Sequence, residues 1–279
     1  METLVALDAY GVNPGDLAWS RFEQLGELTV FDHTTCAELV PRAGEATALL
    51  LDMLPLGESE LEQLPKLRYV GLFATGHDHI DVEAAARRGI AVTNVPEYST
   101  PSVAQMAFAL LLDVTNHIRG YAAYVADGLW TDGREFRYLE KPLVELSGKT
   151  MGILGFGTIG AAVARIAAAF GMRILAWSRT PKETPGSDVE WAELSEVFRR
   201  SDVLSLHLPL TERTAGIVNR DSIGLMKPHS IVVNTARGGL IVDEDLADAL
   251  SAGRIAAAAL DVVGQAEPPQ PENPLLRAP

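Results

Sequence analysis

A glycine-rich segment between an apolar run and an alanine-rich run is the feature that most constrains the fold. The sequence MGILGFGTIGAAVARIAAAFG, residues 151–171, places Gly155, Gly157 and Gly160 in the spacing G-x-G-x-x-G. A strand is predicted before these glycines and a helix after them, which is the setting that gives the spacing meaning. There the first glycine permits a tight turn, the second lets the backbone approach a pyrophosphate, and the third lets the helix pack closely on the strand. A glycine turn without a ligand is the alternative, but this context favours a dinucleotide site.

The predicted dinucleotide site also includes the residues between the glycines: Phe156, Thr158 and Ile159. The helix that follows would present free N–H groups and a partial positive charge to the phosphates.

The end of the next predicted strand, in LAWSRTPK (175–182), indicates which dinucleotide binds. Sites for NAD usually carry Asp or Glu at this point, which bonds to the ribose hydroxyls. Here Ser178 occupies it, followed by Arg179 and Thr180, with Lys182 beyond. A serine can donate a hydrogen bond to a 2′-phosphate, and an arginine can pair with it bidentately. We therefore expect a preference for NADP(H), with NAD(H) possible if Arg179 is only a solvated charge.

Two series of apolar runs alternate with helix-friendly stretches. The first series of predicted strands is 3–8, 46–52, 68–73 and 90–95, and the second is 149–155, 173–178, 202–208, 230–236 and 254–262. Strands that alternate with helices indicate parallel, doubly wound sheets. We therefore predict an α/β protein with one domain at residues 1–98 and another at 99–279.

Three local features accompany this division. Gly89 is expected to cap a helix that ends in AAARR. A long helix is predicted over residues 100–119, capped by Ser99 or Thr100 with Pro101 in its first turn. Residues 127–146 have no clear period and are expected to form an extended arm or a loop.

Composition excludes several classes of function. The net charge is −14 and the basic residues are scattered, which argues against nucleic-acid and membrane partners. No apolar run approaches the roughly 20 residues that span a bilayer, and the start of the chain does not read as a signal peptide. Cys36 is the single cysteine, so no intrachain disulfide and no thiolate-rich metal site is expected. These features favour a cytoplasmic protein without a metal.

Several long segments, in order, resemble the D-isomer-specific 2-hydroxyacid dehydrogenases. They are GHDHIDVEAAARRGIAVTNVPEYSTPSVAQ (76–105), GILGFGTIG (152–160), LSLHLPLTERTAGIVN (204–219), LMKPHSIVVNTARGGLI (225–241) and GRIAAAALDVVGQAEPPQPENPLL (253–276). The segment VTNVPEYSTPSVAQ is similar to the glycerate dehydrogenase, or glyoxylate/hydroxypyruvate reductase, branch. The resemblance implies a flavodoxin-like substrate domain, a Rossmann cofactor domain, an active site in the cleft between them, and hydride transfer between a nicotinamide and a small 2-oxo or 2-hydroxy acid.

The resemblance also implies roles for individual residues. Arg237 in NTARGG would bind the carboxylate and polarise the carbonyl, as a guanidinium fork can. Glu267 in QAEPP would orient the acid/base histidine, although the spacing from Asp261 is one residue longer than in the family pattern. Backbone N–H groups at Thr75 and Gly76 would hold the substrate carboxylate. The nicotinamide side would be lined by His207, Pro209, Thr214, Thr235, Ala236 and Asp261.

The family's acid/base histidine stands in a T-P-H motif, which none of the six histidines shares: His33, His77, His79, His117, His207 and His229. We expect that histidine, and a helix that returns to the substrate domain, to belong to a tail beyond Pro279. If the chain stops there, the alternative is a truncated or non-catalytic NADP(H)-binding relative. A dinucleotide sensor and a formate or phosphite dehydrogenase are weaker alternatives. The resemblance further implies a homodimer that uses the helix at 100–119.

Overall fold

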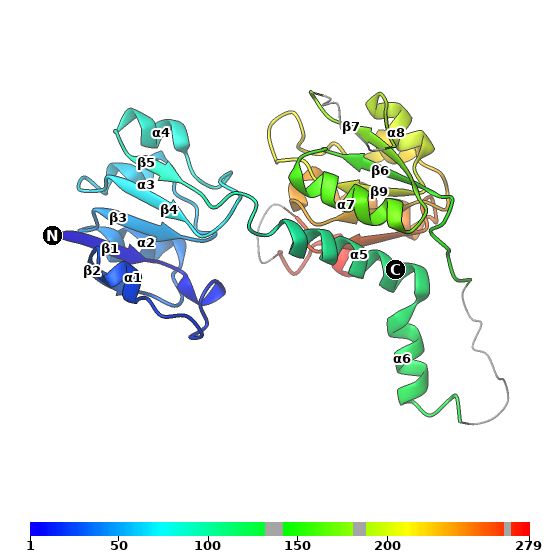
Figure 1. The fold of residues 1–279 in the computed structure, drawn as a ribbon, viewed down its shortest axis with the longest axis horizontal. Coiled ribbons are helices and arrows are strands. Elements are labelled where there is room, and N and C mark those ends of the chain that lie inside the picture. Colours follow the sequence, from blue (N-terminus) through cyan, green and yellow to red (C-terminus); the bar gives the residue numbers. More distant parts are fainter. Residues whose placement is uncertain (132–141, 181–187, 265–268) are drawn as a thin grey trace. The chain divides into compact units, whose positions relative to one another are not determined.

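The computed structural model describes residues 1–131, 142–180, 188–264 and 269–279. The chain divides into two compact units, Met1–Tyr98 and Ser99–Pro279, called here the first and second unit. Each unit is built around one parallel β-sheet with helices packed on it (Figure 1). The predicted α/β fold with two doubly wound parallel sheets is confirmed.

The first unit contains a five-stranded sheet in the order β2-β1-β3-β4-β5, the flavodoxin-like order. Its strands are β1 (Glu2–Ala6), β2 (Gly26–Val30), β3 (Ala48–Leu51), β4 (Tyr69–Leu72) and β5 (Ala91–Thr93). Its helices are η1 (Ala9–Gly11), α1 (Ser20–Glu23), α2 (Cys36–Ala43), α3 (Glu58–Glu62) and α4 (Val82–Arg87). Alternate strand residues such as Leu49, Leu51 and Val70 are fully buried against α2, α3 and α4, as the two-residue repeat of a strand requires.

The second unit contains a six-stranded sheet in the order β11-β10-β9-β6-β7-β8. On one side of β6 lie β7 and β8, and on its other side lie β9, β10 and β11. The strands are β6 (Thr150–Leu154), β7 (Arg173–Trp177), β8 (Val189–Trp191), β9 (Val203–Leu206), β10 (Ile231–Asn234) and β11 (Ala257–Leu260). The helices are α5 (Thr100–Asn116), α6 (Ile118–Ala126), α7 (Thr158–Ala169), α8 (Leu194–Arg200), α9 (Arg220–Leu225), η2 (Gly238–Leu240), α10 (Asp243–Ser251) and η3 (Pro274–Leu276). One core joins the sheet to α5 and α7, and the other joins it to α8, α9 and α10. Because both faces are covered, the central strands are mostly apolar and form nearly continuous hydrophobic runs, which makes them easy to recognise in the sequence.

Two short strands were not predicted, β2 and β8. Each lies at the edge of its sheet and is exposed or half-buried at every residue, so neither forms an apolar run. Gly89 does cap α4 as predicted: its φ is +73° and its N–H donates to the carbonyl of Ala86.

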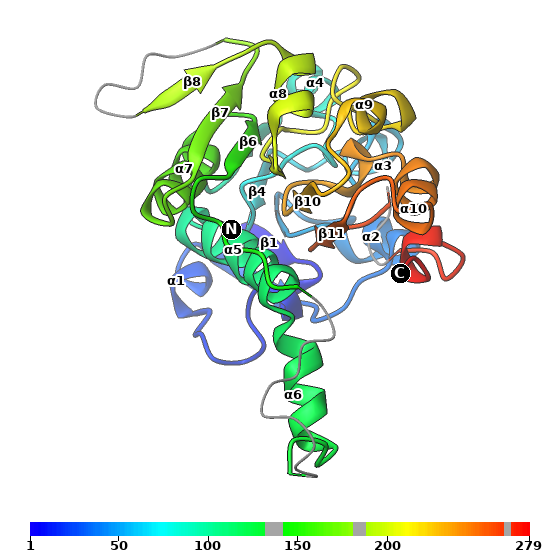
Figure 2. The ribbon, with the colours of Figure 1, turned by 90° about the vertical axis from the view of Figure 1, so that its right-hand side faces the viewer.

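The prediction of one helix over residues 100–119 is wrong. His117 adopts the left-handed conformation, with φ 52° and ψ 39°, and separates α5 from α6. Before it, the Thr115 hydroxyl donates to the carbonyl of Leu111, and beyond it the carboxylate of Asp113 accepts the N–H of Arg119. Side-chain bonds to the backbone compete with helix continuation in this way. As a result α6 runs on from α5 away from the sheet (Figure 2) and buries none of its residues.

The expected cap of α5 is also absent. Ser99 occupies the N-cap position but makes no side-chain capping bond, and the buried hydroxyl of Thr100 has no hydrogen-bond partner among the described residues. Pro101 does lie in the first turn. Across the described ranges, no helix is long and apolar enough to cross a membrane.

A buried carboxylate joins three segments at the amino-terminal edge of the second sheet. Asp202 accepts hydrogen bonds from Lys227 (2.7 Å), His229 (3.0 Å) and the N–H of Thr150 (2.7 Å). Burial alone would raise the pKa of Asp202, but the bonds from Lys227, Thr150 and His229 outweigh it and lower the pKa to about 2. The ionised carboxylate therefore stabilises the fold at neutral pH.

Asp202→Asn is expected to lower the free energy of unfolding by about 2 kcal/mol at neutral pH, because charge-assisted bonds to a buried group are lost. Since the pKa is lowered in the folded state, this stabilisation is fully present above about pH 4 and is lost as the pH falls towards 2. Denaturant titrations at several pH values measure it. Asp248→Asn, which removes an exposed partner of Arg220, is the control and should change stability by less than about 0.5 kcal/mol. Equal effects of the two substitutions would contradict the assignment.

Candidate functional site

The glycine turn after β6 is formed by close backbone contacts. Gly155 has φ +96°, and a Cβ built on it would lie 2.4 Å from the carbonyl oxygen of His207. A Cβ on Gly160 would lie 2.2 Å from the carbonyl oxygen of Gly155. By contrast, no atom of the described residues lies within 4 Å of a Cβ built on Gly157, which is the exposed N-cap of α7. The turn thus requires two of its glycines for packing and leaves open space over the third.

Most residues predicted to bind the cofactor follow directly after strands of the second sheet. Because these strands are parallel, their carboxyl ends share one edge. The residues at this edge are Gly155 after β6; Ser178, Arg179 and Thr180 after β7; His207 and Pro209 after β9; Thr235, Ala236 and Arg237 after β10; and Asp261 after β11. The glycine turn lies between β6 and β9, where the strand order reverses and where such sheets bind ligands.

The aromatic side chain within the turn packs against the sheet edge. The ring of Phe156 is 5.2 Å from that of Trp191 on β8, in an edge-to-face arrangement. Thr158 begins α7 and is exposed, and Ile159 is half-buried. This packing fixes the start of α7 relative to β7 and β8.

His207 follows β9 and accepts or donates one side-chain hydrogen bond, between its Nε2 and the hydroxyl of Ser205 at 2.9 Å. Burial lowers the pKa of His207 to about 4, so the imidazole is neutral at pH 7. A neutral imidazole at this position does not supply an acidic proton at neutral pH.

The loop after His207 is closed by a threonine. The hydroxyl of Thr214 donates to the carbonyl of Pro209 (2.6 Å) and accepts the N–H of Thr211 (2.8 Å). These bonds hold residues 209–214 as one compact loop at the same edge of the sheet.

The turn after β10 is shaped by the fully buried Asn234. Its side-chain oxygen accepts the N–H of Ala236 (3.0 Å), and its amide group donates to the carbonyl of Arg237 (2.9 Å). The half-buried guanidinium of Arg237 donates to the carbonyl of Ala236 (2.8 Å). Asn234 therefore fixes the backbone from which Arg237 projects.

Thr235, in the same turn, has a buried hydroxyl without a hydrogen-bond partner among the described residues. An orphaned buried hydroxyl is costly unless a ligand or water satisfies it. Together with the open space over Gly157 and the partial positive charge at the N-terminal end of α7, it fits a bound dinucleotide.

The residues after β7 carry no carboxylate up to the end of the described segment. Ser178 is half-buried and its hydroxyl lies 3.5 Å from the carbonyl of Thr180, a weak contact. Arg179 is exposed, and Lys182 lies outside the described residues. The serine hydroxyl is thus available to a ligand at this edge.

The segment that follows β11 packs against the Arg237 turn. A Cβ on Gly238 would lie 1.9 Å from the carbonyl oxygen of Gly264, so the two backbones are in direct contact. Further along, the amide of Asn273 donates to the carboxylate of Asp243 at the start of α10 (2.6 Å). Glu267, predicted to be catalytic, lies between these two contacts and outside the described residues.

The predicted substrate loop belongs to the first unit and follows β4. Thr75 and Gly76 are both half-buried. The Thr75 hydroxyl donates to the carbonyl of Val95 (2.9 Å), and the amide of Asn94 donates to the carbonyl of Thr75 (2.7 Å). The loop is thus bonded to the segment that follows β5.

Sequence reasoning did not single out Ser205, Asn234 and Asn94. Each makes side-chain bonds to a residue that was predicted. The signal for Asn234 and Asn94 is an asparagine one to two positions after the apolar core of a strand, where it can bond to a neighbouring turn. Ser205 lies within an apolar strand and left no such signal.

The chain is similar to several known proteins. Residues 108–279 match the family described as D-isomer specific 2-hydroxyacid dehydrogenase, NAD binding domain. A hydroxypyruvate reductase from Blautia hydrogenotrophica is 42% identical over 279 residues, which is 99% of this chain and 86% of the relative. A glyoxylate reductase from Aeropyrum pernix is 42% identical over 85% of this chain and 72% of its own. Among solved structures, an acyclic imino acid reductase in complex with NADPH and D-Arg has a TM-score of 0.86 and 28% identity, covering 100% of this chain and 87% of that one.

Gly157→Ala is expected to weaken NADPH binding by more than about tenfold, because the new methyl group enters the open space that a pyrophosphate would approach. The fold should tolerate the change, since no atom lies near the new Cβ and an alanine at an N-cap costs only about 1 kcal/mol. Fluorescence titration with NADPH and thermal unfolding measure the two effects.

Gly224→Ala in α9 is the matched control, because its Cβ also meets nothing within 4 Å. It should leave NADPH affinity unchanged. Gly160→Ala should instead lower stability and affinity together, because its Cβ collides with backbone. Wild-type affinity in Gly157→Ala would show that the turn does not bind the pyrophosphate.

Proposed function

Since the chain belongs to the D-isomer-specific 2-hydroxyacid dehydrogenases, we propose that it reduces small 2-oxo acids, of the glyoxylate and hydroxypyruvate type, by nicotinamide-dependent hydride transfer. The observation that carries the proposal is the shared sheet edge of the second unit. There an open glycine turn, an orphaned hydroxyl at Thr235 and a guanidinium at Arg237 follow strands of one sheet. The first of these suits a dinucleotide and the last suits the oxygen atoms of an acid substrate.

A bound nicotinamide would supply the hydride. Residues of the chain bind the substrate and stabilise the negative charge that forms on it. Arg237 binds the substrate's carboxylate and polarises the carbonyl at C2, so that negative charge forming on the carbonyl oxygen is stabilised. The turn held by Asn234 supports this role because it limits where the guanidinium can project. The backbone N–H groups of Thr75 and Gly76 bind the carboxylate of the substrate.

Glu267 is proposed to orient the group that donates the proton to the carbonyl oxygen. Support comes from its place in the sequence between Gly264, whose backbone contacts the Arg237 turn at Gly238, and Asn273, which donates to Asp243. A carboxylate close to an imidazole favours the charged, proton-donating form. His207 is not proposed for that part, because its pKa of about 4 keeps it neutral.

Arg237→Ala is expected to lower kcat/KM for glyoxylate by at least about a hundredfold, the usual effect of losing a group that stabilises transition-state charge. Arg237→Lys should recover only part of the loss, because an ammonium lacks the planar fork. NADPH oxidation followed at 340 nm, together with NADPH affinity, measures both steps.

Arg220→Ala provides the control, since it removes an exposed arginine that pairs with Asp245 and Asp248 in the same unit. It should not change turnover. Undiminished turnover in Arg237→Ala would reject the mechanism. NADPH binding without turnover in the wild type would instead support the alternative of a non-catalytic relative.

The proposed cofactor is NADP(H) in preference to NAD(H). Ser178 and Arg179 support this preference, because a hydroxyl and a guanidinium can both bind a 2′-phosphate that a carboxylate would repel. A structural relative, the acyclic imino acid reductase, is bound to NADPH in its solved structure.

Replacing both residues, Ser178→Asp with Arg179→Ala, should shift the ratio of NADPH to NADH affinity by at least about tenfold towards NADH. Titration of each variant with both cofactors measures the ratio. Arg173→Ala, at the opposite end of the same strand, removes one exposed arginine and should leave the ratio unchanged. An unchanged ratio in the double variant would mean that these side chains do not contact the phosphate.

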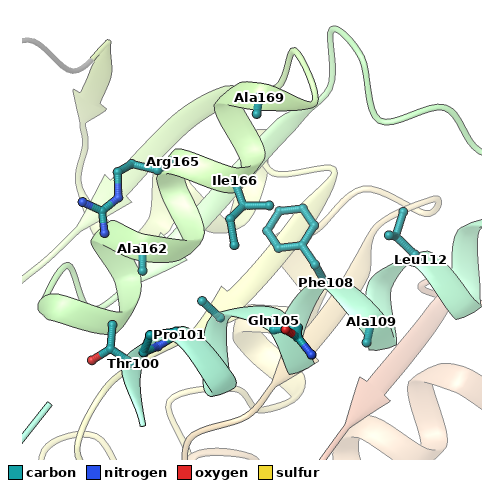
Figure 3. A pocket seen from close by; sticks show the side chains of 11 residues that line it. Thr100, Pro101, Gln105, Phe108, Ala109, Leu112, Ala162, Arg165, Ile166 and Ala169 are labelled. Carbon is teal, nitrogen blue, oxygen red and sulfur yellow. The ribbon is translucent and has the colours of Figure 1, made fainter. Parts of the chain in front are cut away.

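The proposed partner is a second copy of the chain, and the proposed contact is an apolar groove between α5 and α7. The groove has a volume of ≈ 720 Å³, and Phe108 and Ile166 point into it from the two helices (Figure 3). Phe108 also stacks on Phe170 at 5.4 Å. An apolar groove of this size on one face is typical of an interaction site. Light scattering that returns the 30.0 kDa of one chain at all concentrations would contradict the dimer.

The proposed compartment is the cytoplasm. The single cysteine, Cys36, is a free and exposed thiol, which supports a reducing environment. Recovery of the protein with secreted material in a fractionation experiment would contradict it.

A further inference from the structure

We infer that Asn94 is a positioning residue for the substrate: its side chain aims the backbone N–H of Gly76 at the substrate carboxylate. The inference rests on the proposed function and names a residue that acts through the loop and does not touch the substrate.

Three hydrogen bonds join the loop after β4 to the segment after β5. The N–H of Val95 donates to the carbonyl of Ala74 (3.0 Å), the amide of Asn94 donates to the carbonyl of Thr75 (2.7 Å), and the hydroxyl of Thr75 donates to the carbonyl of Val95 (2.9 Å). Two successive carbonyls of the loop are therefore turned towards residues 94–95.

Because the peptide bond is planar, the direction of each of these carbonyls also sets the direction of the N–H group that follows it. In a trans peptide the carbonyl and the following N–H lie in one plane and point in opposite directions. With the carbonyl of Ala74 held by Val95, the N–H of Thr75 points away from residues 94–95. With the carbonyl of Thr75 held by Asn94, the N–H of Gly76 does the same. Among the described residues neither N–H has a hydrogen-bond acceptor, so both are available to an anion, as two successive donors suit a carboxylate.

Little else in the described part of the first unit fixes this orientation. Before the loop, the ring of Phe73 packs on Trp19 (5.9 Å) and Phe22 (6.2 Å). The loop residues themselves are only half-buried, and Asn94 and Val95 are exposed. Because the peptide between Thr75 and Gly76 is only partly enclosed, the side-chain bond from Asn94 has a large share in deciding which way it faces.

Of the three hydrogen bonds, the one from the Asn94 amide can be removed by mutation without replacing any residue of the loop after β4. Asn94→Asp keeps the size of the side chain but replaces the amide donor with an oxygen, which repels the carbonyl of Thr75. That peptide then loses its preferred orientation, and the Gly76 N–H is no longer held towards the substrate.

The test uses the full chain and two ligands, glyoxylate as substrate and oxamate as a non-reducible analogue with the same carboxylate. Asn94→Asp is expected to raise the KM for glyoxylate and the Kd for oxamate by about tenfold each, with kcat changed much less. The Kd for NADPH should stay at its wild-type value, because the glycine turn belongs to the second unit. Asn94→Ala, which adds no charge, should show the same pattern to a smaller extent.

The pH dependence separates this role from a structural one. A protonated carboxyl group can donate a hydrogen bond, so the ratio of the Asn94→Asp KM to the wild-type KM should fall as the pH is lowered from about 8 to about 5. A loop that is merely destabilised would show no such recovery.

Asn219→Asp is the matched control. The Asn219 amide also donates to a backbone carbonyl at 2.7 Å, that of Gly216, but at the start of α9 in the second unit. It should leave all three constants unchanged. Wild-type KM and oxamate affinity in a folded Asn94→Asp variant would overturn the inference while leaving the proposed function intact. A wild-type protein that binds NADPH but neither acid would overturn the proposed function, and this inference with it.

Discussion

The backbone of the second unit comes so close to itself at the carboxyl edge of the sheet that three positions there exclude any side chain. Gly155 lies against the carbonyl of His207, Gly160 lies against Gly155, and Gly238 lies against Gly264. These contacts draw β6, β9, β10 and the segment after β11 together at one edge. The open space over Gly157 and the position of Arg237 both depend on this convergence. The candidate site is therefore a consequence of backbone packing before any side chain contributes.

The side chains that complete the edge mostly bond to backbone. Asn234 spans its own turn, Thr214 closes the loop after His207, and Asn94 holds the loop of the first unit. Asparagine and threonine serve well in such places, because a short polar side chain can satisfy backbone groups that no strand or helix partner reaches. Each of these side chains holds a neighbouring group that is proposed to contact a ligand, but does not contact the ligand itself. Such residues therefore orient the groups that bind the cofactor and the substrate.

The electrostatics of the second unit are divided between the two edges of its sheet. At the amino edge, Asp202 is fully partnered and its pKa is lowered to about 2. At the carboxyl edge, the imidazole of His207 is kept neutral by burial, and the hydroxyl of Thr235 has no partner among the described residues. Satisfied groups stabilise the fold, whereas an unsatisfied group costs free energy that a ligand can recover. This contrast is a physical reason to place the ligand at the carboxyl edge.

The fold class and the glycine turn follow from the amino-acid sequence alone, because buried parallel strands are nearly continuous apolar runs and a G-x-G-x-x-G turn has a fixed spacing. Prediction from the sequence failed for β2 and β8, whose edge positions leave no apolar run, and at His117, where side-chain bonds to the backbone end a helix whose pattern would have continued. The role predicted for Arg237 came from the family resemblance and not from a periodic pattern in the sequence. The directions in which the backbone N–H and carbonyl groups of the site point, by contrast, depend on contacts between segments distant in sequence. Asn94 and Thr75 are 19 residues apart in sequence, and their contact exists because β4 and β5 pair in parallel, which no local pattern records.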